Sequence, residues 1–69
     1  MFKYYVEKTD NDKRMILYVS ESKADVMAKA KEIRRKRADD EDTISVCGAE
    51  FNSDNRRADN RCKFYGIIR

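Results

Sequence analysis

The spacing of apolar residues changes twice along this chain, and that change limits the possible folds more than any other feature of the sequence. Apolar and polar residues alternate over residues 2–8, and an apolar run over residues 15–19 follows a cluster of Asn and Asp. A helical spacing occupies residues 23–37, and strand-like segments return at residues 43–51 and 61–69. Alternation predicts half-buried strands, whereas a period near 3.6 residues predicts an amphipathic helix. The sequence therefore predicts the order β-β-α-β-β.

The segment expected to form the helix carries signals at both ends. Ser22 precedes it as an N-cap, and Asp25 places an acid near the positive end of the helix dipole. Four consecutive cations, Arg34–Arg37, stand at the other end, where the dipole favours positive charge. The apolar positions on one face are Val26, Met27, Ala30 and Ile33. We expect this face to cover one side of a sheet.

The first two strands are expected to form a hairpin. The segment Asn11–Asp12 supplies central turn residues that tolerate left-handed geometry. This turn pairs Val6 with Leu17 and Tyr5 with Tyr18, so that the apolar residues share one face.

The helix returns the chain after the second strand, which makes the third strand parallel to the second. The sheet is antiparallel throughout if the first strand neighbours the third, or if the second neighbours the fourth. We expect one α+β domain over residues 1–69, a four-stranded, mainly antiparallel sheet with the helix packed on one face. The sheet residues expected to face the helix are Tyr4, Val6, Leu17, Val19, Ile44, Val46, Phe64 and Ile68.

The register of the last two strands is chosen by the apolar pattern. Pairing Val46 with Phe64 and Ile44 with Gly66 keeps the apolar residues on one face. The same register separates the two cysteines onto opposite faces, so we expect no disulfide between them. A phase change near Gly48 also favours a bulge at that point.

The opposite face of the sheet is expected to be apolar and uncovered. Its residues are Tyr5, Ile16, Tyr18, Tyr65 and Ile67, with Lys3, Arg61 and Lys63 at its edge. A domain of this size buries only about 60% of the surface that its unfolded chain exposes. The favoured interpretation is therefore that a homodimer covers this face. The alternatives are a platform on which tyrosines stack nucleobases or a contact with another protein.

Cations are concentrated in the second half of the helical segment. Residues 29–37 hold six cations and one acid, whereas residues 39–42 are all acidic. One interpretation is a solvated helix face that the acidic segment partly neutralises, and the other is a surface that attracts a polyanion. Arg69 and the arginines of the loop add to this surface if the fold brings them together. The favoured function is contact with nucleic-acid phosphates through Lys29, Arg34, Arg35, Lys36, Arg37, Arg56, Arg57 and Arg61.

The composition argues against catalysis. The chain has no His and only two Cys, so it lacks the side chains on which most acid–base catalysts and metal sites depend. Its two glycines are isolated, which excludes the glycine-rich loops that cradle phosphates. We expect a non-enzymatic protein with no catalytic residue, metal or cofactor. The chain also lacks a signal peptide and a membrane-spanning apolar run, which predicts a cytoplasmic protein that does not enter membranes.

The expected layout of a hairpin, a helix opened by Ser-x-x-Ala or Ser-x-x-Asp and a second hairpin resembles that of some small phage-encoded inhibitor proteins, certain anti-CRISPR proteins among them. This resemblance implies a small cytosolic protein that acts by binding. It extends to the layout and to no residue motif, so no site residue is carried over. A protein-interaction module that uses the tyrosine face or the charged helix is thus the alternative to nucleic-acid binding.

Overall fold

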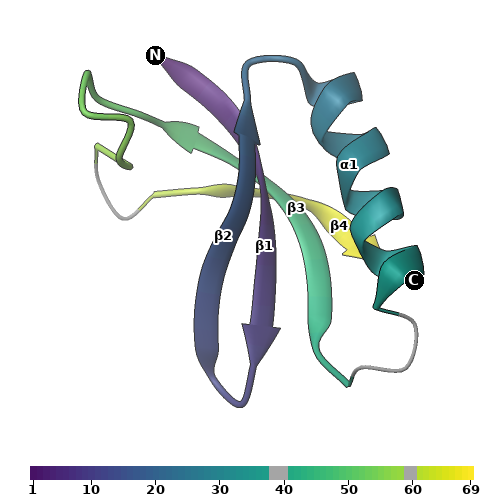
Figure 1. Cartoon of the computed structure of the whole chain (residues 1–69). Coiled ribbons are helices and arrows are strands. Elements are labelled where there is room, and N and C mark those ends of the chain that lie inside the picture. Colours follow the sequence, from purple (N-terminus) through teal and green to yellow (C-terminus); the bar gives the residue numbers. More distant parts are fainter. Residues whose placement is uncertain (38–40, 59–60) are drawn as a thin grey trace.

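The computed structural model describes residues 1–37, 41–58 and 61–69, and it confirms the order β-β-α-β-β and the α+β class (Figure 1). The helix begins where the sequence predicts, because the Ser22 hydroxyl accepts a hydrogen bond from the Asp25 amide at 3.2 Å. The elements are β1 (Phe2–Asp10), β2 (Lys13–Ser20), α1 (Lys23–Lys36), β3 (Thr43–Glu50) and β4 (Lys63–Ile68).

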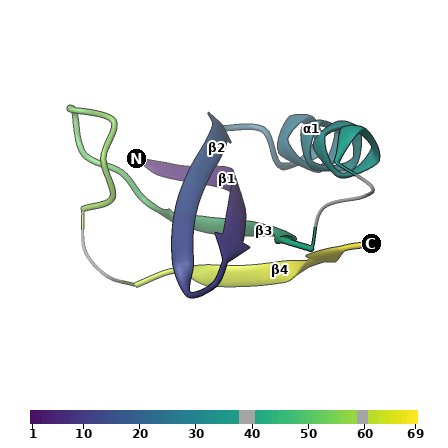
Figure 2. The same cartoon turned by 60° about the horizontal axis from the view of Figure 1, so that its bottom comes forward.

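The four strands form one antiparallel sheet in the order β2-β1-β3-β4. Of the two strand orders left open by the sequence, the structure has the one in which the first strand neighbours the third. The helix α1 returns the chain across one face, so β3 pairs with β1 and runs parallel to β2. Figure 2 shows α1 on that side of the sheet and the loop after β3 at the other end of the molecule. We call the side of the sheet away from α1 the far face.

The first hairpin follows the predicted register near its turn and departs from it farther along. Asn11 and Asp12 both have positive φ angles, of 48° and 69°, as a two-residue hairpin turn with a right-handed twist requires. A register shift then leaves Leu17 without a partner, so Val6 pairs with Tyr18. The predicted pairing of Val6 with Leu17 is therefore wrong. The extra residue turns Tyr18 toward α1 and Val19 toward the far face.

The pairing of β3 with β4 also contains a shift, between Val46 and Cys47. Val46 lies opposite Gly66 and Cys47 opposite Phe64, which leaves Tyr65 as the extra residue on β4. The predicted pairing of Val46 with Phe64 is therefore wrong. Because of this bulge, Phe64 shares the far face with Cys47, and Tyr65 packs on the helix side.

Each side of the sheet has its own buried cluster. The helix side holds the larger one, whose five fully buried members are Val6, Val26, Ala30, Ile44 and Val46. The far face holds a smaller one made of Tyr5, Cys47, Ala49 and Phe51, with Val19 packed against it. The prediction that the far face is uncovered is therefore correct only for the half that this second cluster does not occupy. No helix in the described parts of the chain is long and apolar enough to cross a membrane.

Candidate nucleic-acid interface

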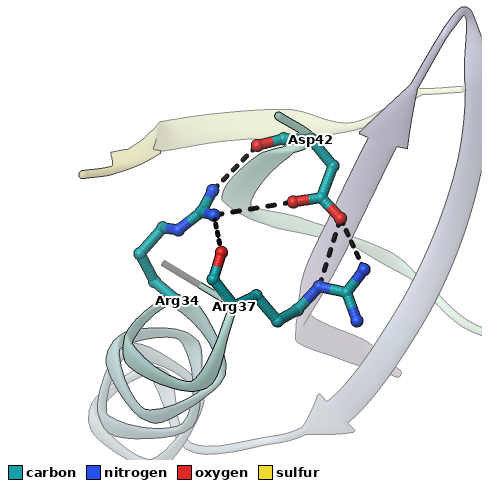
Figure 3. A network of polar contacts seen from close by, with 3 residues as sticks. All are labelled: Arg34, Arg37 and Asp42. Carbon is teal, nitrogen blue, oxygen red and sulfur yellow. Dashed lines mark hydrogen bonds and ion pairs between the residues drawn. The ribbon is translucent and has the colours of Figure 1, made fainter. Parts of the chain in front are cut away.

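Two of the predicted phosphate-binding arginines are held by a buried carboxylate (Figure 3). The Asp42 side chain is 4% exposed, and its Oδ2 accepts hydrogen bonds from Arg37 Nε at 3.1 Å and Nη2 at 2.7 Å. Arg34 Nη1 donates to the Asp42 carbonyl oxygen at 2.8 Å, and its Nη2 donates to the Arg37 carbonyl oxygen. These contacts join the end of α1 to the start of β3. Neutralisation of the cationic run by the acidic segment is thus confirmed for Asp42, whereas residues 39 and 40 lie outside the described parts.

Two further predicted residues, Lys29 and Lys36, form ion pairs with one acid on the same helix. Glu32 lies 3.5 Å from Lys29 Nζ and 3.0 Å from Lys36 Nζ, at the spacing of one helical turn. The hydrogen bond from Lys36, assisted by the charge of Lys29, lowers the pKa of Glu32. All three side chains are more than a third exposed, so water screens these pairs and they add little stability.

The remaining cations of the helix end line a groove of about 300 Å³ between α1 and the end of β4. Among the described residues, its walls are Lys31, Arg34, Arg35, Ile68 and Arg69, and no acidic side chain is among these five. We call this the basic groove. Lys31 and Arg35 lie one turn apart on α1, and Figure 1 shows the chain's C-terminal residue beside the end of that helix. Of the residues predicted to contact phosphates, the groove contains only Arg34 and Arg35.

Two groove residues, Lys31 and Arg69, are not among the residues predicted to contact phosphates, although Arg69 was expected to add to the surface if the fold brought it there. Lys31 lies within the cationic run, and its spacing of four residues from Arg35 was a usable signal, since residues four apart share a helix face. The position of Arg69 depends on the strand order, which the sequence left open.

The loop arginines lie at the other end of the molecule. Arg56 and Arg57 follow β3 in the green loop of Figures 1 and 2, away from the end of α1. Asn52 shapes this loop, because its Oδ1 accepts hydrogen bonds from the amides of Asp54 at 3.0 Å and Arg56 at 3.2 Å. Arg61 lines a separate hollow with Phe2 and Lys63. The fold therefore does not unite these arginines with the basic groove.

The tyrosines predicted for the far face do not gather there. Tyr5 does lie on that side, but it is fully buried. This burial is the main reason why the pKa of its hydroxyl is raised. Tyr18 lies on the helix side and donates a hydrogen bond to Asp25 at 2.7 Å. Tyr65 is also on the helix side, where the Lys23 ammonium lies 4.4 Å from its ring centroid. The prediction of an exposed tyrosine face is therefore wrong, because the two bulges turn Tyr18 and Tyr65 to the other side.

The uncovered half of the far face contains a second hollow, of about 250 Å³. Its exposed apolar residues are Phe64, 63% exposed, and Ile67, 48% exposed. We call this the apolar hollow, and its lining consists of Glu7, Thr9, Arg14, Thr43, Ser45, Cys47, Cys62, Phe64 and Ile67. Ile67 and Ile16, which pairs with Glu7 on the hairpin, are thus both exposed on the far face as predicted.

Both cysteines line the apolar hollow, so their predicted separation onto opposite faces is wrong. Both are free, with Cys47 buried and Cys62 exposed. Burial raises the pKa of the Cys47 thiol, which keeps it protonated at neutral pH. Cys62 lies two residues before Phe64, the partner of Cys47, and such diagonal neighbours are about 7–8 Å apart, farther than a disulfide spans without backbone movement.

Comparison of the chain with family models, curated proteins and solved structures finds no match. Within residues 1–37, 41–58 and 61–69, no three His, Cys, Asp or Glu side chains are grouped closely enough to hold a metal ion. The chemistry of the basic groove and the apolar hollow therefore carries the functional argument.

Proposed function

We propose that this chain is a non-enzymatic, cytoplasmic protein that binds the phosphate backbone of nucleic acid through the basic groove. The observation that carries the proposal is the lining of the groove, which within residues 1–37, 41–58 and 61–69 has four cationic side chains and no acidic one. The cations of residues 29–37 fall into two groups, because some of them form ion pairs with acidic side chains and others line the groove. Lys29, Lys36 and Arg37 are paired with Glu32 or Asp42, and the groove cations Lys31, Arg35 and Arg69 face solvent outside those pairs.

The proposed contact neutralises phosphates without reading bases. Arg35 and Arg69 carry planar guanidinium groups that match the geometry of a phosphate, whereas Lys31 acts as a point charge. Arg34 adds a fourth charge, which its contacts with Asp42 hold in place at the wall of the groove. Such contacts release counterions and do not distinguish base sequences. We assign the loop residues Arg56, Arg57 and Arg61 no part in this contact because the fold places them elsewhere.

Binding of labelled duplex and single-stranded oligonucleotides, measured by fluorescence anisotropy across a salt series, tests the proposal. Non-specific binding of this kind has dissociation constants of about 10⁻⁴ to 10⁻⁶ M and weakens steeply as salt rises. We expect similar affinities for unrelated sequences of equal length. Absence of binding at about 50 mM salt, where phosphate contacts are strong, would overturn the proposal.

A second candidate function is contact with protein through the far face. Its support is the exposure of Phe64 and Ile67 in the apolar hollow, since isolated domains rarely leave contiguous apolar surface uncovered. An inhibitor of the phage or mobile-element kind would use such a surface against its target, and a homodimer would use it against a second copy. The charges around the hollow favour the second copy.

A further inference from the structure

The far face of the sheet is only half covered. Phe51, 3% exposed, packs against the fully buried Tyr5 and covers this part of the far face. The other half presents the apolar hollow, and Ile16, 39% exposed, adjoins it because Ile16 pairs with Glu7 across the hairpin. Three exposed apolar residues, Ile16, Phe64 and Ile67, therefore share one surface. A surface of this kind indicates an interface.

The described residues that line the hollow include one charge of each sign, on neighbouring strands. Glu7 on β1 and Arg14 on β2 both line it, and they are diagonal neighbours because Glu7 pairs with Ile16 and Arg14 with Thr9. Among the residues that the structure describes, neither side chain has an ion-pair partner within 4 Å. An uncovered apolar surface with one available anion and one available cation is complementary to a rotated copy of itself.

We propose that a second copy of this chain covers the apolar hollow, in a two-fold arrangement in which Glu7 of each copy meets Arg14 of the other. In an interface with two-fold symmetry every contact occurs twice with the roles exchanged, so a surface that carries both signs satisfies itself. A polyanion would meet Glu7 and leave the apolar side chains unmatched, which makes nucleic acid a poor occupant. The proposal is independent of nucleic-acid binding, since no residue of the basic groove takes part.

Sedimentation equilibrium, from about 10 µM to about 1 mM protein, covers the dissociation constants expected of a small interface. We expect the wild type to dimerise and Phe64→Ser to weaken self-association at least about tenfold, as loss of a central aromatic does. Met15→Ser is the matched control. Met15 is 55% exposed and apolar, but it pairs with Lys8 and lies on the opposite side of the hairpin. Circular dichroism confirms that each variant is folded.

Charge exchange gives a second test that does not depend on Phe64. Glu7→Arg and Arg14→Glu are each expected to weaken the dimer at least about tenfold by placing like charges together. The double variant restores opposite charges and is expected to return to within about threefold of the wild type. A wild type that stays monomeric at every concentration overturns the proposal and leaves the hollow for a different protein. Equal effects of Phe64→Ser and Met15→Ser, or no recovery in the double variant, would also contradict it.

Discussion

Arg34 and Arg37 are both bound to Asp42 at the end of α1, whereas Lys31 and Arg35 on the same two turns lie outside that contact and face the basic groove, whose wall Arg34 also forms. The two pairs have the same formal charge and are interleaved in the sequence, yet their environments differ. Arg37 lies 2.7 Å from a carboxylate that is 4% exposed, and Lys31 and Arg35 line a groove in which the described part of the chain places no acidic side chain. The difference shows that a run of cations can serve two purposes. Some of its side chains stabilise the fold through Asp42, and others remain available to a ligand.

The largest effect on this comparison is expected from Asp42→Ala, which removes the acid that holds both bound arginines. Loss of one member of a buried ion pair costs about 3–5 kcal/mol. Arg34 and Arg37 are partly exposed and regain water, so we expect a loss of about 2–3 kcal/mol in the free energy of unfolding. Urea denaturation measures it. Oligonucleotide affinity at a temperature where the variant is folded should not fall, because no groove cation is removed.

A contradictory outcome for this variant would be a loss below about 0.5 kcal/mol, the range of ordinary surface substitutions. It would mean that water replaces the contacts of Asp42 at no cost and that the contacts of the two arginines with Asp42 do not stabilise the fold. Glu41→Ala serves as the comparison, because Glu41 is the exposed acid next to Asp42.

The next largest effect is expected from a comparison of substitutions at Arg37 and at Arg35, two residues away on the chain. We expect Arg37→Ala to lower the free energy of unfolding by about 1–2 kcal/mol, since Asp42 then keeps Arg34 as an ion-pair partner. Arg35→Ala should stay within about 0.5 kcal/mol of the wild type. Affinity for an oligonucleotide should show the reverse order, with the larger loss in Arg35→Ala. If both variants change stability and affinity in parallel, the division of the run is wrong.

The sequence predicted the helix, the four strands and the turn of the first hairpin, since these depend on local patterns. Ser22 caps α1, and residues 11 and 12 form the hairpin turn, because the side chains and backbone angles concerned are set within a few residues. The predicted basic character of the helix end was correct for the same reason.

The bulges at Leu17 and Tyr65 could not be predicted, and they decide what the far face displays. The segment from Met15 to Val19 is apolar on both sides, so inserting one residue leaves no mark in its alternation. Each insertion changes the faces of nearby residues, which turns Tyr18 and Tyr65 to the helix side and leaves Phe64 exposed on the far face. The groove needed the strand order as well, because β4 brings Arg69 to α1.

The smallest effect is expected from Glu32→Gln, which releases the lysines that this acid binds. Glu32 is exposed, so the free energy of unfolding should change by less than about 0.5 kcal/mol. Removing one negative charge beside the groove should raise oligonucleotide affinity about twofold at low salt, and the gain should vanish as salt rises. A fall in affinity would show that Lys29 and Lys36, once released, do not add to the field of the groove.

The most direct measurement of the central claim compares two double variants that each remove two positive charges. Lys31→Ala/Arg35→Ala alters the basic groove, and Arg56→Ala/Arg57→Ala alters the loop at the other end of the molecule. We expect the groove variant to lose at least about tenfold in duplex affinity at about 50 mM salt, and its salt dependence to fall by about 1.8 in slope, or 0.9 for each lost contact. The loop variant should stay within about twofold. Equal losses in both variants, or a larger loss in the loop variant, would contradict the assignment of the groove.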